Sequence, residues 1–343
     1  MMKHIIPFII IASVLTTSCK GEGTGACEPI QGTLKLSLNT SAATKVQVQS
    51  ETSISTMTFL FFSTLTGELE RTLDLSTISG DVSISLKAGP KTIYAYANHS
   101  VSGAGTTLSA QPLTGSAGLT ESSWGHFPMR GCISVDVPAG GVVSRSVYLT
   151  RCASRLSVVS ITNSLPNGLP LTVLGAYLAD AYMADTPGSA SVDSWCWKWG
   201  RDASQNLPSA VPASICTWTE GLPYTVPNGT TWTVPQPSTS KGPRMYCMPN
   251  PSAANGSPWQ PGASWTPLVT KLVLIARTGT SAPFYYSIPL PSLEANESRE
   301  FLLTIHGLGT IDPELPAGSL SFTLAPTSPP YDPGPTYTDD FTP

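Results

Sequence analysis

Apolar and polar residues alternate along several short stretches of the chain, which is the pattern of β-strands with one buried face. Residues 33–38 and 82–86 follow this alternation, whereas residues 57–62 form a nearly continuous apolar run that is typical of a buried central strand. No longer stretch shows a convincing helical period. The first part of the chain therefore predicts a set of strands, which also includes residues 92–97 and 142–149.

A second group of strand-like stretches begins near Arg155 and is interrupted by a long segment of different character. Residues 185–267 are rich in Pro, Gly, Ser, Trp and Cys, which predicts a loop-rich insertion. We expect an all-β fold of two β-sandwich domains that meet near residue 151, followed by a Pro-rich tail over 326–343. The strands expected in the second domain are 156–161, 171–178, 268–276, 284–290, 300–305 and 319–324, with a turn over 166–168.

The start of the chain has the features of an export signal. A basic residue, Lys3, precedes the apolar run 5–15, which is too short to span a bilayer, since spanning takes roughly 20 apolar residues. Thr16 to Ser18 then lead into Cys19, as in a bacterial lipoprotein signal, although Thr16 stands where leucine is usual. We expect removal of residues 1–18 and lipidation of Cys19, which would tether the chain to the outer membrane. The alternative is a secreted protein that is cleaved elsewhere.

Composition and charge narrow the function. Only 12% of the residues are charged, against about 25% in ordinary soluble domains, and the chain has 32 Pro and 29 Gly. This composition disfavours long helices that need charged outer faces. The net charge of −4 leaves no basic surface for a phosphate backbone, so we expect no nucleic-acid partner.

Cysteines offer candidate disulfides in an exported chain. Equal gaps separate Cys132 from Cys152 and Cys196 from Cys216, so local pairs are compatible with the spacing, although other pairings stay open. The chain contains no C-x-x-C pair, and no cluster of ligand-type residues implies a metal or a cofactor.

Neither hydrolases nor nucleotide-binding enzymes are indicated by motif. The chain lacks G-x-S-x-G, H-E-x-x-H and a P-loop, so we expect no enzyme activity, with a lipid-anchored hydrolase as a remote alternative. Trp195, Trp197 and Trp199 are spaced by two and would share one face of a strand. They are candidates for a flat platform on which sugars stack, and the competing interpretation is that they cover a thin core.

Several segments, in this order and spacing, resemble the fimbrillins of Bacteroidales. Beyond the lipoprotein-like start, the resemblance rests on residues 56–62 with Thr66-Gly67, 86–89 leading into 92–98, 127–129, 149–156 and 301–309 with Asp312-Pro313. It covers most of the chain except residues 185–267.

The resemblance implies two transthyretin-like β-sandwich domains in tandem, over residues 19–150 and 151–325, in a subunit of cell-surface fimbriae. In that family a protease removes the first strand of the lipoprotein precursor, and a strand from a neighbouring subunit fills the opened groove. The expected partners are thus other fimbrial subunits and, for an adhesive subunit, a glycan or protein on a host or bacterial surface.

The expected processing site departs from the family pattern. The removable strand would be 33–38, and Lys45 is the only basic residue between it and the next core strand, where the family has an Arg. A weakened site favours an uncut anchor subunit, whereas the insertion and the Pro-rich tail favour a tip or accessory subunit, to which we lean. The alternative function is a stand-alone surface lipoprotein that binds glycans.

Overall fold

A computed structural model of the chain has an all-β architecture. Among the residues that it describes, two 3-10 turns, Pro166–Gly168 and Ser214–Cys216, are the only helical elements. None of these residues belongs to a helix long and apolar enough to cross a membrane. The structure describes residues 30–40, 53–76, 82–98, 101, 119, 124–179, 181–182, 196–197, 214–236, 242–249, 269–290, 292–312 and 320–324.

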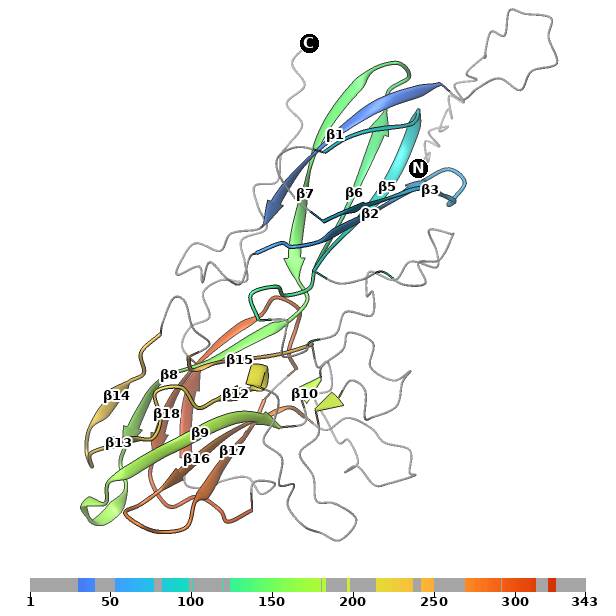
Figure 1. Cartoon of the computed structure of the whole chain (residues 1–343). Helices are drawn as coiled ribbons and strands as arrows, with labels where there is room; N and C mark the ends of the chain where they lie inside the picture. The colour runs from blue at the N-terminus through green and yellow to red at the C-terminus, as the bar shows by residue number, and fades with distance from the viewer. Residues whose placement is uncertain are drawn as a thin grey trace, which may run out of the picture.

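The first seven strands occupy one half of an elongated molecule, and the strands from β8 onward occupy the other (Figure 1). The first seven pair in the order β3-β2-β5-β6-β7-β1-β4. β6 and β7 pair only at two positions, Met129 with Arg151 and Arg130 with Thr150, so the sheet opens into two layers. The bounds are β1 Gln31–Thr40, β2 Met57–Ser63, β3 Leu69–Leu75, β4 Val82–Lys87, β5 Gly89–Ala97, β6 Met129–Val137 and β7 Val142–Arg151.

A first hydrophobic core lies between these two layers. β2 is buried along almost its whole length, as the apolar run predicts, and its Phe59 and Phe61 enter this core. The alternation predicted for β4 is also confirmed, because Ile84 and Leu86 are buried while their neighbours are exposed. The first core consists of Leu34, Leu36, Met57, Phe59, Phe61, Ile84, Leu86, Ile93, Ala95, Ala97, Met129, Val135, Val137, Val147 and Leu149.

Two further sheets form the other half. In one, β9 pairs with β12, β13 and β16, and β16 pairs with β17; in the other, β8 pairs with β14, β15 and β18, and β18 pairs with β19. A second core, larger than the first, holds side chains from both sheets. The longer strands are β8 Ser154–Asn163, β9 Leu171–Ala179, β16 Lys271–Arg277, β17 Phe284–Pro289, β18 Ser298–Ile305 and β19 Leu320–Leu324.

Part of the segment predicted to be loop-rich contributes short strands to these sheets. They attach to the outer edges of β8 and β9 and so widen both sheets. These strands are β12 Thr217–Trp218, β13 Tyr224–Val226, β14 Thr231–Thr233 and β15 Arg244–Cys247, and the pair β10 Ala181–Tyr182 and β11 Cys196–Trp197 stands apart.

Candidate functional site: the inserted first strand

β1 lies between β4 and β7, which do not pair with each other in the described sheet. It pairs with β4 in antiparallel register, from Gln31 opposite Lys87 to Leu36 opposite Val82. On its other side it runs parallel to β7, from Thr33 opposite Val142 to Thr40 opposite Leu149. Because β4 joins the sheet through β1 alone among the described strands, the position of β1 decides whether this layer is complete (Figure 1).

The side chains of β1 divide into a buried and an exposed set. Leu34 and Leu36 are fully buried in the first core, whereas Lys35 between them is exposed. Burial of a leucine side chain stabilises a fold by about 1.5–3 kcal/mol relative to exposure. The two leucines therefore hold β1 in place through the single apolar face that the alternation creates.

The start of β1 is tightly enclosed by the β6–β7 turn. Thr33 N–H donates to the Gly141 carbonyl, and Gly140 N–H donates to the Gln31 carbonyl, each over 2.8 Å. A Cβ atom at Gly32 would lie 2.1 Å from the Pro138 carbonyl oxygen, so only glycine allows this approach. The groove is thus shaped to admit one extended chain.

Removal of β1 would leave two kinds of unsatisfied surface. The backbone groups of β4 and β7 that face it would lose their hydrogen bonds, and the apolar side chains under Leu34 and Leu36 would become exposed. Unpaired strand edges beside an apolar groove accept an incoming strand, because main-chain hydrogen bonds and alternate side chains satisfy both. The arrangement thus supports the binding of an extended chain between β4 and β7 in place of β1.

The residues predicted for processing lie outside the described part of the chain. This holds for Cys19, the predicted lipidation site, and for Lys45, the predicted cleavage site. The described chain leaves β1 at Thr40 and resumes at residue 53, so Lys45 lies in the connection between β1 and β2. Both assignments stay predictions.

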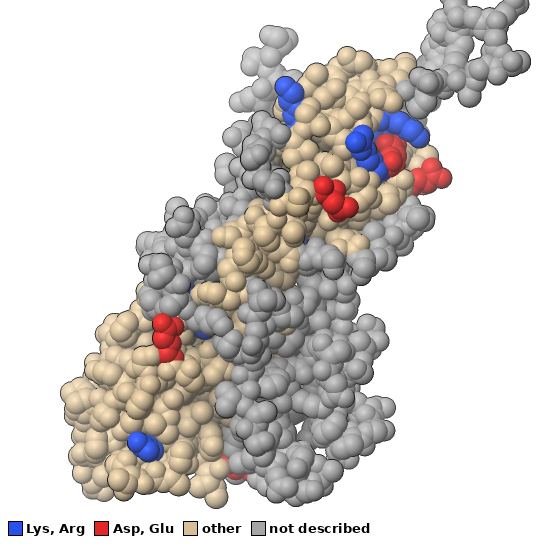
Figure 2. All heavy atoms as spheres, viewed as in Figure 1, with Lys and Arg blue, Asp and Glu red and all other residues tan. Residues whose placement is uncertain are grey.

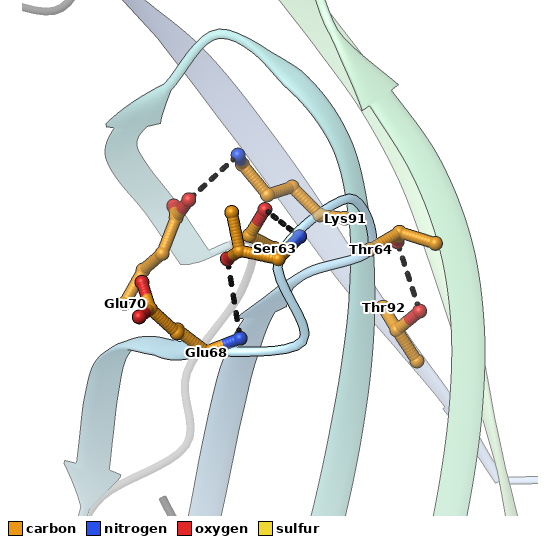
Figure 3. Close-up of polar contacts among 7 residues, drawn as sticks. Ser63, Thr64, Glu68, Glu70, Lys91 and Thr92 are labelled. Carbon is orange, nitrogen blue, oxygen red and sulfur yellow. Dashed lines mark hydrogen bonds and ion pairs between the residues drawn. The ribbon is translucent and has the colours of Figure 1, made fainter. Parts of the chain in front are cut away.

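A buried ion pair fastens the edge strand β3 to the sheet. Lys91 of β5 reaches across the end of β2, and its Nζ lies 2.9 Å from Oε1 of Glu70 in β3 (Figure 3). The two side chains are 3% and 11% exposed. Beside them the β2–β3 turn is closed by a hydrogen bond from Ser63 N–H to the Glu68 carbonyl, and Gly67 takes a positive φ of 72°.

Charged side chains are sparse over the face drawn in Figure 2. On the half formed by the first seven strands, basic and acidic side chains lie next to one another. Within the described ranges, no group of three or more His, Cys, Asp and Glu residues is placed to hold a metal ion.

The cysteines occupy different environments. Cys132 of β6 is exposed, next to Tyr94, and partial burial raises the pKa of its thiol. Cys152 is buried, and its N–H bonds the Pro128 carbonyl, four residues before Cys132 along an extended chain. That separation, roughly 13 Å at the strand rise, exceeds the span of a disulfide of about 7 Å, so this register does not favour the pair. The disulfides stay predictions.

Two cysteines, Cys216 and Cys247, are buried close together in the second core. The thiol of Cys216 donates a hydrogen bond to the carbonyl of Tyr246, the residue that directly precedes Cys247 in the chain. Burial raises the pKa of Cys216 well above its ordinary value and that of Cys247 to about 12. The side chain of Cys196, the predicted partner of Cys216, lies outside the described residues.

The structure reveals an aromatic cluster that the sequence patterns did not identify. Trp195 and Trp199 lie outside the described chain, and of Trp197 only the backbone in β11 is described, so the predicted platform is untested. Instead, Trp232 of β14 stacks on Tyr224 of β13 with ring centroids 4.0 Å apart. No period links these residues, and their presence in a Trp-rich segment is the only sequence signal.

Comparisons with known proteins support the fold. No protein-family model and no curated protein sequence matches the chain. The chain is similar to crystal structures of candidate cell adhesion proteins from Bacteroides eggerthii (16% identity, TM-score 0.53, covering 88% of this chain and 97% of that one) and Parabacteroides distasonis (15%, 0.54, 87% and 97%). It is also similar to a fimbrilin from Porphyromonas gingivalis (12%, 0.52, 85% and 96%). The resemblance to fimbrillins is thus confirmed at the level of the fold.

Proposed function

We propose that this chain is a structural or adhesive subunit of cell-surface fimbriae, assembled by strand complementation between subunits. It would be exported as a lipoprotein with its lipid on Cys19 and would reach the outer membrane before joining the fimbrium. Its folded part would consist of two transthyretin-like β-sandwich domains, residues 19–150 and 151–325. The fold shared with a fimbrilin and with candidate adhesion proteins supports this proposal.

The position of β1 is the observation that carries the proposal. A strand at the start of a domain, placed between β4 and β7 and joined to β2 by a connection of its own, can leave without breaking any other pairing. Its departure would open a groove with two bare strand edges. A neighbouring subunit's strand with apolar residues at alternate positions would restore what Leu34 and Leu36 supply.

Cleavage after Lys45 is the proposed trigger, because it would separate β1 from β2 covalently. A chain cut there would polymerise as a tip or accessory subunit. A chain left intact would keep β1 and its lipid, as an anchor subunit does. The large segment 185–267 and the Pro-rich residues 326–343 favour the tip or accessory role.

The experiment treats the full-length precursor with trypsin, inhibits the protease before adding a peptide that itself contains Lys35, and follows two readouts. N-terminal sequencing detects a new terminus at Val46, and fluorescence anisotropy detects capture of a labelled peptide of residues 30–40. We expect the cut chain to bind the peptide, and a peptide carrying Leu34→Asp and Leu36→Asp not to bind. The matched protein control is Lys45→Gln, which shares every other trypsin site and should bind neither peptide.

Native mass spectrometry of the same samples reports assembly. The cut wild-type chain should form oligomers, while the Lys45→Gln chain stays monomeric. A chain that begins at Val46 yet captures no peptide and forms no oligomer would show that strand complementation through β1 is wrong.

A further inference from the structure

A pocket opens where the added edge strands of the second half approach one another. Its volume is about 410 Å³, at the small end of the range of about 300–1,000 Å³ found for small-molecule sites. β12 and β13 belong to the sheet of β9, whereas β14 and β15 belong to the sheet of β8, so the pocket spans the edges of both layers. β13 and β14 lie together at one side of this half (Figure 1).

Three aromatic residues line the pocket and stack on one another. Trp232 stacks on Tyr224 with the ring planes 16° apart, and on its other partner, Trp218, with centroids 5.8 Å apart and planes 27° apart. Trp218 is fully buried, while Tyr224 is 39% exposed. The stack is therefore anchored in the core and ends in an exposed ring.

Two polar side chains on the pocket wall are held in place and carry acceptor atoms. Glu220 accepts a hydrogen bond at Oε2 from Gly242 N–H over 3.0 Å, and its main-chain carbonyl accepts one from the Trp218 indole over 2.9 Å. Gln236 donates through Nε2 to the carbonyl of Val158 over 2.9 Å. These bonds leave Oε1 of the carboxylate and Oε1 of the amide as further acceptors.

The strands that present these groups are themselves braced. The hydroxyls of Thr172 and Thr225 lie 3.0 Å apart between β9 and β13, and those of Thr162 and Thr231 lie 2.8 Å apart between β8 and β14. The site is thus formed before any ligand arrives, which lowers the ordering cost of binding.

This chemistry distinguishes between ligand classes. In a stack the ring faces cover one another, so the exposed end ring, Tyr224, offers a single flat face, whereas a cage for a quaternary ammonium needs several ring faces turned toward one common point. Acceptor oxygens beside an aromatic face suit a ligand with hydroxyl donors around an apolar C–H face. Glu220 is the only carboxylate or basic group among the lining residues, so an anionic ligand would meet like charge.

We propose that this pocket binds a neutral sugar unit of a glycan, with the sugar ring stacked on the exposed ring of Tyr224 and its hydroxyls donating to Glu220 and Gln236. This site is distinct from the predicted platform at Trp195, Trp197 and Trp199. It does not depend on strand complementation, because none of its lining residues belongs to the first core.

The test incubates the full-length chain with an array of neutral oligosaccharides of glucose, galactose, mannose and N-acetylhexosamines, beside sialylated and sulfated ones. Saturation-transfer NMR with the strongest neutral sugar follows. We expect a neutral sugar to bind, with transfer concentrated on its ring C–H protons. No binding of any neutral sugar at millimolar concentration, or a preference for the anionic glycans, would overturn the proposal.

Variants locate the site. Tyr224→Ala should weaken binding by about tenfold, the worth of one aromatic stacking contact, whereas Tyr224→Phe keeps the ring and should stay close to wild type. Glu220→Gln should raise the relative binding of sialylated glycans. The matched control is Tyr148→Ala, which removes an equally exposed tyrosine from β7 in the first half. Thermal unfolding verifies that each variant is folded, and unchanged binding by a folded Tyr224→Ala chain would also overturn the proposal.

Discussion

The buried pair of Lys91 and Glu70 allows a quantitative test of how the first sheet is held together. Lys91→Met keeps the length of the side chain but removes the ammonium group, and it leaves the Glu70 carboxylate buried without its partner. Oε2 of Glu70 already lacks a hydrogen-bond partner in the structure, so no neighbouring donor compensates for the loss. Breaking a buried pair from one side costs about 3–5 kcal/mol, and we expect a loss of stability in this range.

A double-mutant cycle separates the pair energy from the loss of the individual groups. Glu70→Gln alone removes the other charge, and the double variant Lys91→Met with Glu70→Gln leaves no charge unpaired. We expect the double variant to be clearly more stable than Lys91→Met alone, because a buried charge without a partner costs more than a missing pair. Lys35→Met is the control, since Lys35 is exposed on β1 in the same half.

Hydrogen exchange followed by mass spectrometry is the suitable assay, because it reports peptides from β2 and β5 separately from the second half of the chain. A loss of 3–5 kcal/mol would speed their exchange by roughly 10² to 10³-fold or more where exchange requires opening of this core. Exchange in β8 and β9 should change little. If Lys91→Met costs less than about 1 kcal/mol, or if the double variant is no better than the single one, the reasoning fails.

Three other predictions follow from whether a single side chain is buried or exposed. Leu36→Ala should destabilise the first half by about 2–5 kcal/mol in urea unfolding and speed the release of β1 after cleavage. Lys35→Ala, on the exposed face of β1, should cost at most about 0.5 kcal/mol. Equal effects of the two substitutions would contradict the burial of Leu36. Iodoacetamide should label the exposed Cys132 before the buried cysteines. Because the pKa of the Cys132 thiol is raised above 9.0, the labelling rate should still increase as the pH rises past 9. No labelling of Cys132 before reduction would instead support a disulfide. Asn163→Ala should cost about 3 kcal/mol in thermal unfolding, because the fully buried amide holds three main-chain groups at 2.9–3.0 Å, and a change below 1 kcal/mol would mean that water replaces it.

The strands that sequence patterns predict well have apolar residues either at alternate positions, as in β4, or at nearly every position, as in β2. Residues 57–62 and 82–86 belong to β2 and β4 as expected, and the predicted turn over 166–168 coincides with a 3-10 turn. β3 was not predicted, because an edge strand with the sequence LERTLDL carries polar residues on both faces. β15 was not predicted either, since its four residues are all buried and show no alternation.

The candidate sites were predictable only in part, because they depend on pairings between distant residues. Alternation indicates that residues 33–38 form a half-buried strand, but its parallel pairing with β7 joins positions more than a hundred residues apart. Likewise, Trp218, Tyr224 and Trp232 have no common spacing and meet only because two sheet edges approach each other. A local pattern such as the regular spacing of Trp195, Trp197 and Trp199 attracts notice, whereas a site assembled by the fold does not.

The two proposed sites rest on different hydrophobic cores, and this separation would allow assembly and ligand binding to proceed independently. The β1 groove is lined by the first core, whose members all lie between Leu34 and Leu149. Phe127 precedes β6 in the chain, yet it belongs to the second core and so joins the two halves. Its ring packs on Tyr246 with centroids 4.4 Å apart and lies under the Arg151 guanidinium. Exchange of β1 for a partner's strand would therefore rebuild the first core while the junction and the sugar pocket stay intact. Under the proposed function, the chain would thus be able to change its neighbours without changing what it binds.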